Sequence, residues 1–278
     1  MKIFIYNMEK KYCAPGKGGD KISCLSRESL IKIINSFNQT TSPKNRLTIG
    51  KKSKKMLWNQ FRNKMAKQCK LEVCWVDQDF VKKMNDLDIQ HHTFRPKMPT
   101  SWKRKKNTWL TTTDINLAMK QYEKVYPNFL FIGTVARDCP GGYMCELTGF
   151  DFTRLGKIDN VGVVYNLDPH YKGGSHWVAM NVNVKKRTIN YYDSYGHKPP
   201  NEIHNFMLKI QNDLKKVGKK MKIEYNNKRH QYGGSECGIF SMNFLINSIK
   251  GKSIKQISSM KLTDKKMLEM RDYLYRNK

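Results

Sequence analysis

Long apolar runs and acidic residues are both scarce in this 278-residue sequence. No segment approaches the ~20 consecutive apolar residues that cross a bilayer, so we expect no membrane span. Asp and Glu number 23 against 52 Lys and Arg, which gives a formal net charge of +29. Such an excess favours anionic partners, among them nucleic acid, an anionic membrane surface or an acidic protein, although short basic runs are equally common on solvated faces.

Cysteine is sparse and irregularly spaced, which excludes a disulfide-dense secreted scaffold. The seven cysteines are Cys13, Cys24, Cys69, Cys74, Cys139, Cys145 and Cys237. Their odd number and scattered positions favour reduced thiols in an intracellular compartment. Two of them, Cys69 and Cys74, could meet His91 and His92 around zinc, but the spacing fits no zinc finger. We therefore expect neither a metal nor another cofactor.

The composition indicates a folded protein, because 39% hydrophobic and 11% aromatic residues are more than a disordered chain carries. In the first third, helical periodicity predicts amphipathic helices near residues 26–40 and 54–67. Periodicity is then lost over residues 88–108, a segment with two prolines and a basic cluster that we interpret as a linker. We therefore divide the chain into a basic, mainly helical N-terminal region, residues 1–105, and a main domain, residues 106–278.

The main domain mixes helical and strand patterns, which predicts an α+β fold. A helix capped by Thr113 or Asp114 is expected to end before Pro127. Strands are predicted at 129–136, 161–165, 177–184, 188–192 and 221–225, and two further helices at about 201–217 and 238–249.

The most informative local pattern is a predicted β-hairpin. Residues 177–184 and 188–192 are two strand-type runs separated by a short basic turn. If the turn is centred between residues 184 and 185, antiparallel pairing places His176 opposite Asp193 at one end of the sheet. There a carboxylate can accept the imidazole proton and fix its tautomer. The inference depends on register, because a shift of one residue turns one side chain to the other face.

A second pattern surrounds Cys237, which lies where a glycine-containing segment leads into a predicted helix. Amide groups at a helix start and a neighbouring imidazolium both favour a thiolate. Gly238 would leave room for a substrate backbone, and the side chain of Gln231 could join the Cys237 N–H in stabilising an oxyanion. Alone, a buried cysteine or histidine is more often structural than catalytic. The ordered set is what favours nucleophilic chemistry.

These elements together resemble a known clan of cysteine proteases. GGSHWVAM at 173–180, YYDSYG at 191–196 and QYGGSECGIF at 231–240 are similar to the His-Trp, Tyr-Asp-Ser and Gln…Cys-Gly elements of adenovirus proteases and Ulp1-type SUMO proteases. Within that clan the chain looks most like the polyprotein maturation proteases of large cytoplasmic DNA viruses, African swine fever virus among them. Glu236 departs from the usual Asp before the cysteine, at a position that we expect to leave the chemistry unaffected.

The resemblance implies a mixed sheet flanked by helices and a role for each motif residue. Cys237 would be the nucleophile, His176 the base and then the acid, Asp193 the residue that orients it, and Gln231 the oxyanion donor. Trp109 and Trp177 would bind the substrate as the walls of a narrow cleft.

The same resemblance implies a function and a place. The protein would cleave viral structural polyproteins after Gly-Gly type sites during virion maturation, in the virion and in the host cytoplasm during assembly, with DNA as a partner of its basic surface. Two alternatives stay open. One is an isopeptidase that removes ubiquitin-like proteins such as SUMO, and the other is a basic nucleic-acid-binding protein on a protease scaffold.

Overall fold

The computed structural model describes residues 12–139, 141 and 143–277, and the chain divides into two compact units. One unit comprises Met1–Met98 together with Asp272–Lys278, and the other comprises Pro99–Arg271. The division lies earlier than the expected boundary at residue 105, and the C-terminal residues belong to the first unit. Backbone hydrogen bonds explain the latter difference, because Met98 N donates to Arg276 O at 2.8 Å and Arg276 N donates to Pro96 O at 2.9 Å.

Helices dominate the first unit. The predicted N-terminal helices are present as α1 (Arg27–Thr40) and α2 (Lys54–Met65), and shorter helices follow as α3 (Asp79–Lys82) and α4 (Leu87–His92). Ser26 caps α1 by accepting a hydrogen bond from Ser29 N, as its sequence position predicts. The apolar faces of α1 and α2 form a core whose large buried members include Phe61 and Trp75. Over the described part of the chain, no helix is both long and apolar enough to cross a membrane.

The segment 88–108 is not the featureless linker that its composition suggested. It contains most of α4 and a 3-10 turn, Thr100–Lys103, whose Trp102 is buried. Helical turns of four to six residues are too short to produce a recognisable period, which is why the sequence pattern missed them.

The expectation of reduced cysteines is wrong for six of the seven. Cys13–Cys24, Cys69–Cys74 and Cys139–Cys145 are paired, with Cα separations of 5.3, 5.9 and 6.1 Å. Cys237 alone is free, and it is buried. Within residues 12–139, 141 and 143–277 no three His, Cys, Asp or Glu side chains gather as metal ligands.

The second unit is built on a mixed five-stranded sheet, as the α+β prediction requires. Its strands lie in sequence order: β1 (Phe129–Ala136), β2 (Asn160–Asn166), β3 (Trp177–Asn183), β4 (Thr188–Tyr192) and β5 (Lys222–Tyr225). The outer pairs β1–β2 and β4–β5 are parallel and the two inner pairs are antiparallel. The predicted strands are therefore all present, each within a residue or two of its expected bounds.

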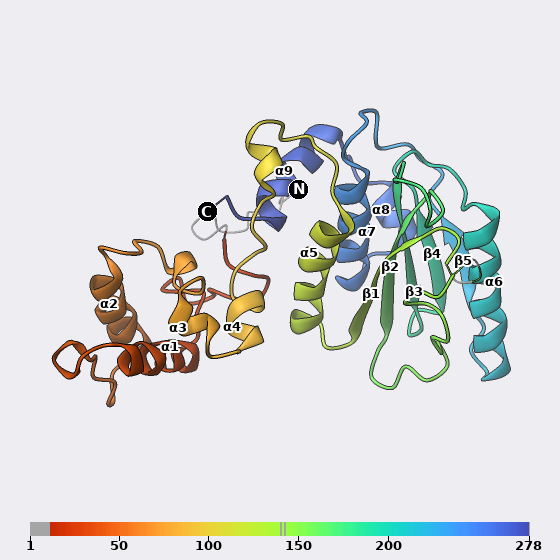
Figure 1. Cartoon of the computed structure of the whole chain (residues 1–278). Helices are drawn as coiled ribbons and strands as arrows, with labels where there is room; N and C mark the ends of the chain where they lie inside the picture. The colour runs from red at the N-terminus through yellow and green to blue at the C-terminus, as the bar shows by residue number, and fades with distance from the viewer. Residues whose placement is uncertain (1–11, 140, 142, 278) are drawn as a thin grey trace. The chain divides into compact units, whose positions relative to one another are not determined.

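Helices cover both faces of this sheet (Figure 1). Helices α5 (Thr112–Val125) and α7 (Cys237–Ile249) lie on one face and α6 (Asn201–Lys216) on the other. The apolar stripe of α6 packs into the main core against alternate residues of β3, which include Val178, Met180 and Val182. Helix α7 is buried on almost every side and its sequence is mainly apolar, and the buried hydroxyls of Ser241 and Ser248 donate to backbone carbonyls. Two helices after α7 were not predicted, α8 (Ile254–Ser258) and α9 (Asp264–Leu274).

The hairpin β3–β4 forms, but its register differs from the predicted one. Asn183 pairs with Thr188 and Ala179 with Tyr192, so the turn is longer than expected and the pairing is displaced by two residues. An even displacement keeps every side chain on its face. His176 and Asp193, immediately before β3 and immediately after β4, therefore still meet, as a diagonal pair instead of a direct one.

Candidate active site

The structure brings His176 and Asp193 together at the end of the hairpin. His176 Nε2 lies 2.7 Å from Asp193 Oδ1, and both side chains are buried. Cys237 acts on the same imidazole, because hydrogen bonding and charge from Cys237 help to raise the pKa of His176, so its sulfur lies beside the ring. A thiol, an imidazole and a carboxylate thus form a connected set, which is the arrangement that activates a cysteine nucleophile.

The surroundings of His176 hold the imidazole in its protonated form. Burial acts to lower its pKa, but the hydrogen bond that the imidazole donates to Asp193, together with hydrogen bonding and charge at Cys237, outweighs this effect and raises the pKa to about 9. An imidazolium at neutral pH is the partner that stabilises a thiolate, and it is ready to protonate the leaving amine.

Asp193 is fixed by groups other than the histidine. Its Oδ1 also accepts the backbone N–H of Tyr195 at 2.8 Å. The side chain of Asn226 grips the backbone on both sides, accepting from Asp193 N at 2.9 Å and donating to Asp193 O at 2.7 Å. The exposed His197 reaches Asp193 Oδ2 at 3.4 Å. The carboxylate therefore has little freedom to turn away from the imidazole.

Cys237 is the first residue of α7, as the sequence predicted, so the free amide groups of the helix start surround its thiol. The preceding residue, Glu236, is buried and forms an ion pair with the fully buried Arg271, Nε to Oε2, at 2.8 Å. Arg271 also donates to Thr108 O at 2.7 Å and to Ser235 O at 3.1 Å. Arg271 therefore fastens the start of α7 to the segment that carries Trp109.

Gln231 is fully buried beside this set and its amide is oriented by neighbours. Ser194 Oγ donates to Gln231 Oε1 at 2.6 Å, and Gln231 Nε2 donates to Gly233 O at 2.8 Å. One amide N–H of Gln231 is thus held by a carbonyl of the loop that leads to Cys237, and an oxyanion would need the other. The assignment of that role to Gln231 stays a prediction.

The two tryptophans behave differently. Trp177 is buried and donates its indole N–H to Leu110 O at 3.0 Å, whereas Trp109 is 42% exposed. A methyl group at Gly238 would approach Leu110 Cδ1 to 2.8 Å and Trp177 Cδ1 to 3.2 Å. Gly238 is thus required by this packing, and not only by the room for substrate that the sequence suggested. A wall of Trp177 and Leu110 consequently stands directly against the residue after Cys237.

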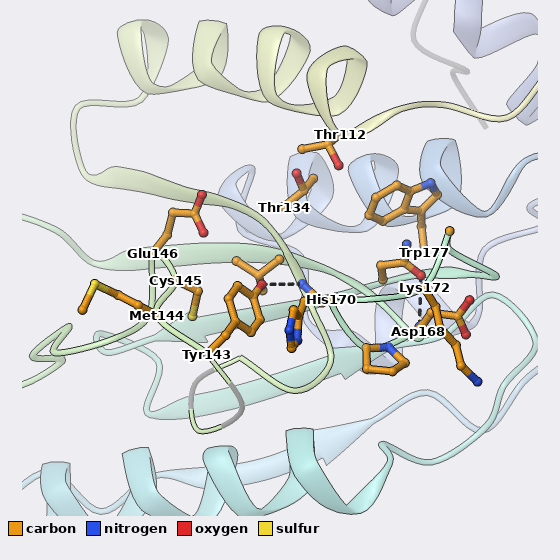
Figure 2. A pocket seen from close by; sticks show the side chains of 15 residues that line it. Thr112, Thr134, Tyr143, Met144, Cys145, Glu146, Asp168, His170, Lys172 and Trp177 are labelled. Atoms are coloured by element: carbon orange, nitrogen blue, oxygen red, sulfur yellow. Dashed lines mark hydrogen bonds between the residues drawn. The ribbon is translucent and has the colours of Figure 1, made fainter.

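A cavity of about 700 Å³ continues from Trp177 (Figure 2). Thr112 at the start of α5 and Trp177 lie at one end, and the side chains of Tyr143, Glu146 and His170 lie further along it. The cavity shares Trp177 with the wall that stands against Gly238.

Sequence reasoning missed three residues that hold the site. Arg271 and Asn226 are far along the chain from the groups that they bind, so no local pattern pointed to them. Tyr195, whose ring stacks on the His176 imidazole at 4.6 Å between centroids, had a signal in the YYDSYG motif, but its role was not inferred.

Comparison with known proteins gives a consistent result. The model of the Ulp1 protease family's C-terminal catalytic domain matches residues 160–278. A thiol protease of Acanthamoeba polyphaga mimivirus is 33% identical over 275 residues, which cover 92% of this chain and 89% of the relative. The SUMO-1 cysteine protease of African swine fever virus is 24% identical over 82% of this chain and 90% of its own length. A crystal structure of an African swine fever virus protease superposes with a TM-score of 0.67 at 21% identity, covering 95% of each chain.

The fold and the connected thiol, imidazole and carboxylate define a cysteine-type peptidase. The chain belongs to the Ulp1 protease family.

Proposed function

We propose that this peptidase is an endopeptidase that cleaves viral structural polyproteins after Gly-Gly type pairs during virion maturation. The observation that carries the proposal is the wall of Trp177 and Leu110 against Gly238, next to Cys237. A substrate that passes this wall to reach the thiol must have little or no side chain at the residues before the cut. Glycine is the residue that meets this condition and allows close backbone approach.

The extent of the relatives supports a part for the helical first unit in the function. The similarity to the mimivirus thiol protease runs through the helical first unit as well as the catalytic one, whereas the Ulp1 catalytic-domain model begins at residue 160. A shared N-terminal unit indicates a shared use for it. A virion protease would act in the particle and in the host cytoplasm during assembly, which follows from the proposal and is checked by immunoblotting purified virions.

One experiment separates the two substrate classes. Purified protein is incubated with Gly-Gly-X peptides and, in parallel, with SUMO and ubiquitin conjugates. The proposal predicts cleavage of the peptides after the second glycine. Efficient release of conjugates without cleavage of the peptides would overturn it and favour the isopeptidase, the activity after which the African swine fever virus relative is named.

The charge of +29 supports DNA as a partner of the protease, not a replacement for catalysis. A cationic surface gathers on DNA through released counterions, which would concentrate the enzyme with its substrates wherever both are held on the genome.

A further inference from the structure

The side of the site beyond Tyr195 carries an exposed arginine. Arg229 is exposed, and its guanidinium lies over the rings of Tyr195, at 5.3 Å, and Tyr232, at 4.7 Å. Its Nε donates to Gln231 O at 2.8 Å, and neither terminal nitrogen has a hydrogen-bond or ion-pair partner among the described residues. The exposed side chain of Lys228 adds a second positive charge to the same surface. We call Arg229, Tyr195 and Tyr232 the arginine shelf.

The backbone holds the arginine shelf in place against the catalytic turn. Gly196 has a φ of +80°, and a side chain there would approach Lys228 C to 2.8 Å and Arg229 N to 2.9 Å. Asn226 ties the same loop to Asp193 and to Lys228 O. Asp264 is the nearby carboxylate, and its Oδ2 accepts the N–H groups of Tyr232 and Gly233. Among the described residues Arg229 makes no direct ion pair with Asp264 or another carboxylate, so its terminal nitrogens can bind an anionic side chain.

The distance from the reacting groups sets which part of a substrate meets this charge. Tyr195 stacks on His176 at 4.6 Å and carries Arg229 on its ring at 5.3 Å. The path from His176 across the Tyr195 ring to Arg229 therefore has the length of two or three residues of extended chain at about 3.3 Å each. Burial and then the charge of Cys237 raise the pKa of Tyr195, which is consistent with a ring lying beside the thiol.

The proposed function places the residues before the cut against Trp177, so the residues after it leave toward Tyr195. The cavity beyond Trp177 has carboxylates at Glu146 and Asp168 but also Lys172, and gives no preference of one sign. The arginine shelf does. Resting on the proposed function, we propose that the arginine shelf is a subsite for the leaving segment and selects polypeptides with Asp or Glu two or three residues after the cleaved bond.

Paired substrates test this subsite. Two quenched fluorescent Gly-Gly-X peptides differ only in Glu or Lys at the second and third positions after the cut. At low salt the wild type should cleave the Glu peptide with a kcat/KM about tenfold higher, since attraction and repulsion each contribute a few-fold for an exposed pair. Arg229→Ala should reduce the ratio to about twofold or less, and Arg229→Glu should reverse it. Arg154→Glu, at an arginine 88% exposed beside Asp151, is the matched control and should leave the ratio unchanged.

Equal cleavage of the two peptides by the wild type, or a Glu preference that survives in Arg229→Glu, would overturn the proposal. Binding of the same peptides to the Cys237→Ala protein separates this failure from failure of the proposed function. The Cys237→Ala protein should bind the Glu peptide more tightly than the Lys peptide, and the double variant Cys237→Ala, Arg229→Glu should lose this preference. That result supports the arginine shelf even if the wild type cleaves neither peptide. Cleavage without any charge preference supports the proposed function and removes the arginine shelf.

Discussion

Replacing Arg271 by leucine should destabilise the catalytic unit strongly. Arg271 is fully buried, and its ion pair with Glu236 has both side chains almost completely removed from water. Arg271→Leu leaves the Glu236 carboxylate buried without a counter-charge, which costs about 3–5 kcal/mol. The Thr108 and Ser235 carbonyls lose a donor in addition. A loss of this size is a large part of the ~5–15 kcal/mol that stabilises a typical native protein.

Urea unfolding followed by tryptophan fluorescence measures this change. Arg154→Leu is the control, because the Arg154–Asp151 pair lies at the surface and should contribute less than about 1 kcal/mol. Glu236→Met combined with Arg271→Leu removes both charges and should recover part of the loss. If Arg271→Leu shifts the free energy of unfolding no more than Arg154→Leu does, the buried pair does not stabilise the start of α7.

Four further predictions concern catalysis, stability and partners. With the pKa of His176 raised to about 9, kcat/KM should persist to about that pH and fall above it, and Asp193→Asn should move this alkaline limb to lower pH; an unmoved limb would contradict the role of Asp193. The stability supplied by the charged imidazole is complete below its ordinary pKa of 6.5 and is lost as pH rises through about 9, which thermal melts across that range should show. Gln231→Ala should lower kcat by about 10²–10³-fold with little change in KM, and a change confined to KM would exclude an oxyanion role. DNA affinity should fall steeply with salt, by about one unit of log-log slope for each phosphate neutralised, and salt-independent binding would remove DNA as a partner of the basic surface.

Periodicity and turn chemistry were sufficient to predict much of the catalytic unit. The five strands and helices α5, α6 and α7 each carry a local pattern of apolar residues that tertiary packing then uses. The contact of His176 with Asp193 followed from hairpin pairing, and it survived a register error because the error was even.

Features that depend on distant parts of the chain could not be predicted in the same way. The contact of Arg271 with Glu236 arises only once the fold has brought these side chains together. The cysteine pairs join residues only 5, 6 and 11 positions apart, but cysteine spacing alone does not say which thiols are oxidised. The reach of residues 272–278 into the first unit is likewise set by backbone hydrogen bonds that no local pattern encodes. Helix α4 has 6 residues, which is fewer than two helical turns, so its apolar residues could not show a helical period.

The central claim is that Cys237 is the nucleophile, and turnover of a Gly-Gly-X peptide by Cys237→Ala beside the wild type tests it most directly. Circular dichroism and the urea midpoint verify that the variant is folded. The account predicts that kcat/KM falls by about 10⁴-fold or more, because removal of a nucleophile eliminates the covalent step. Turnover by the folded variant near the wild-type rate would contradict it.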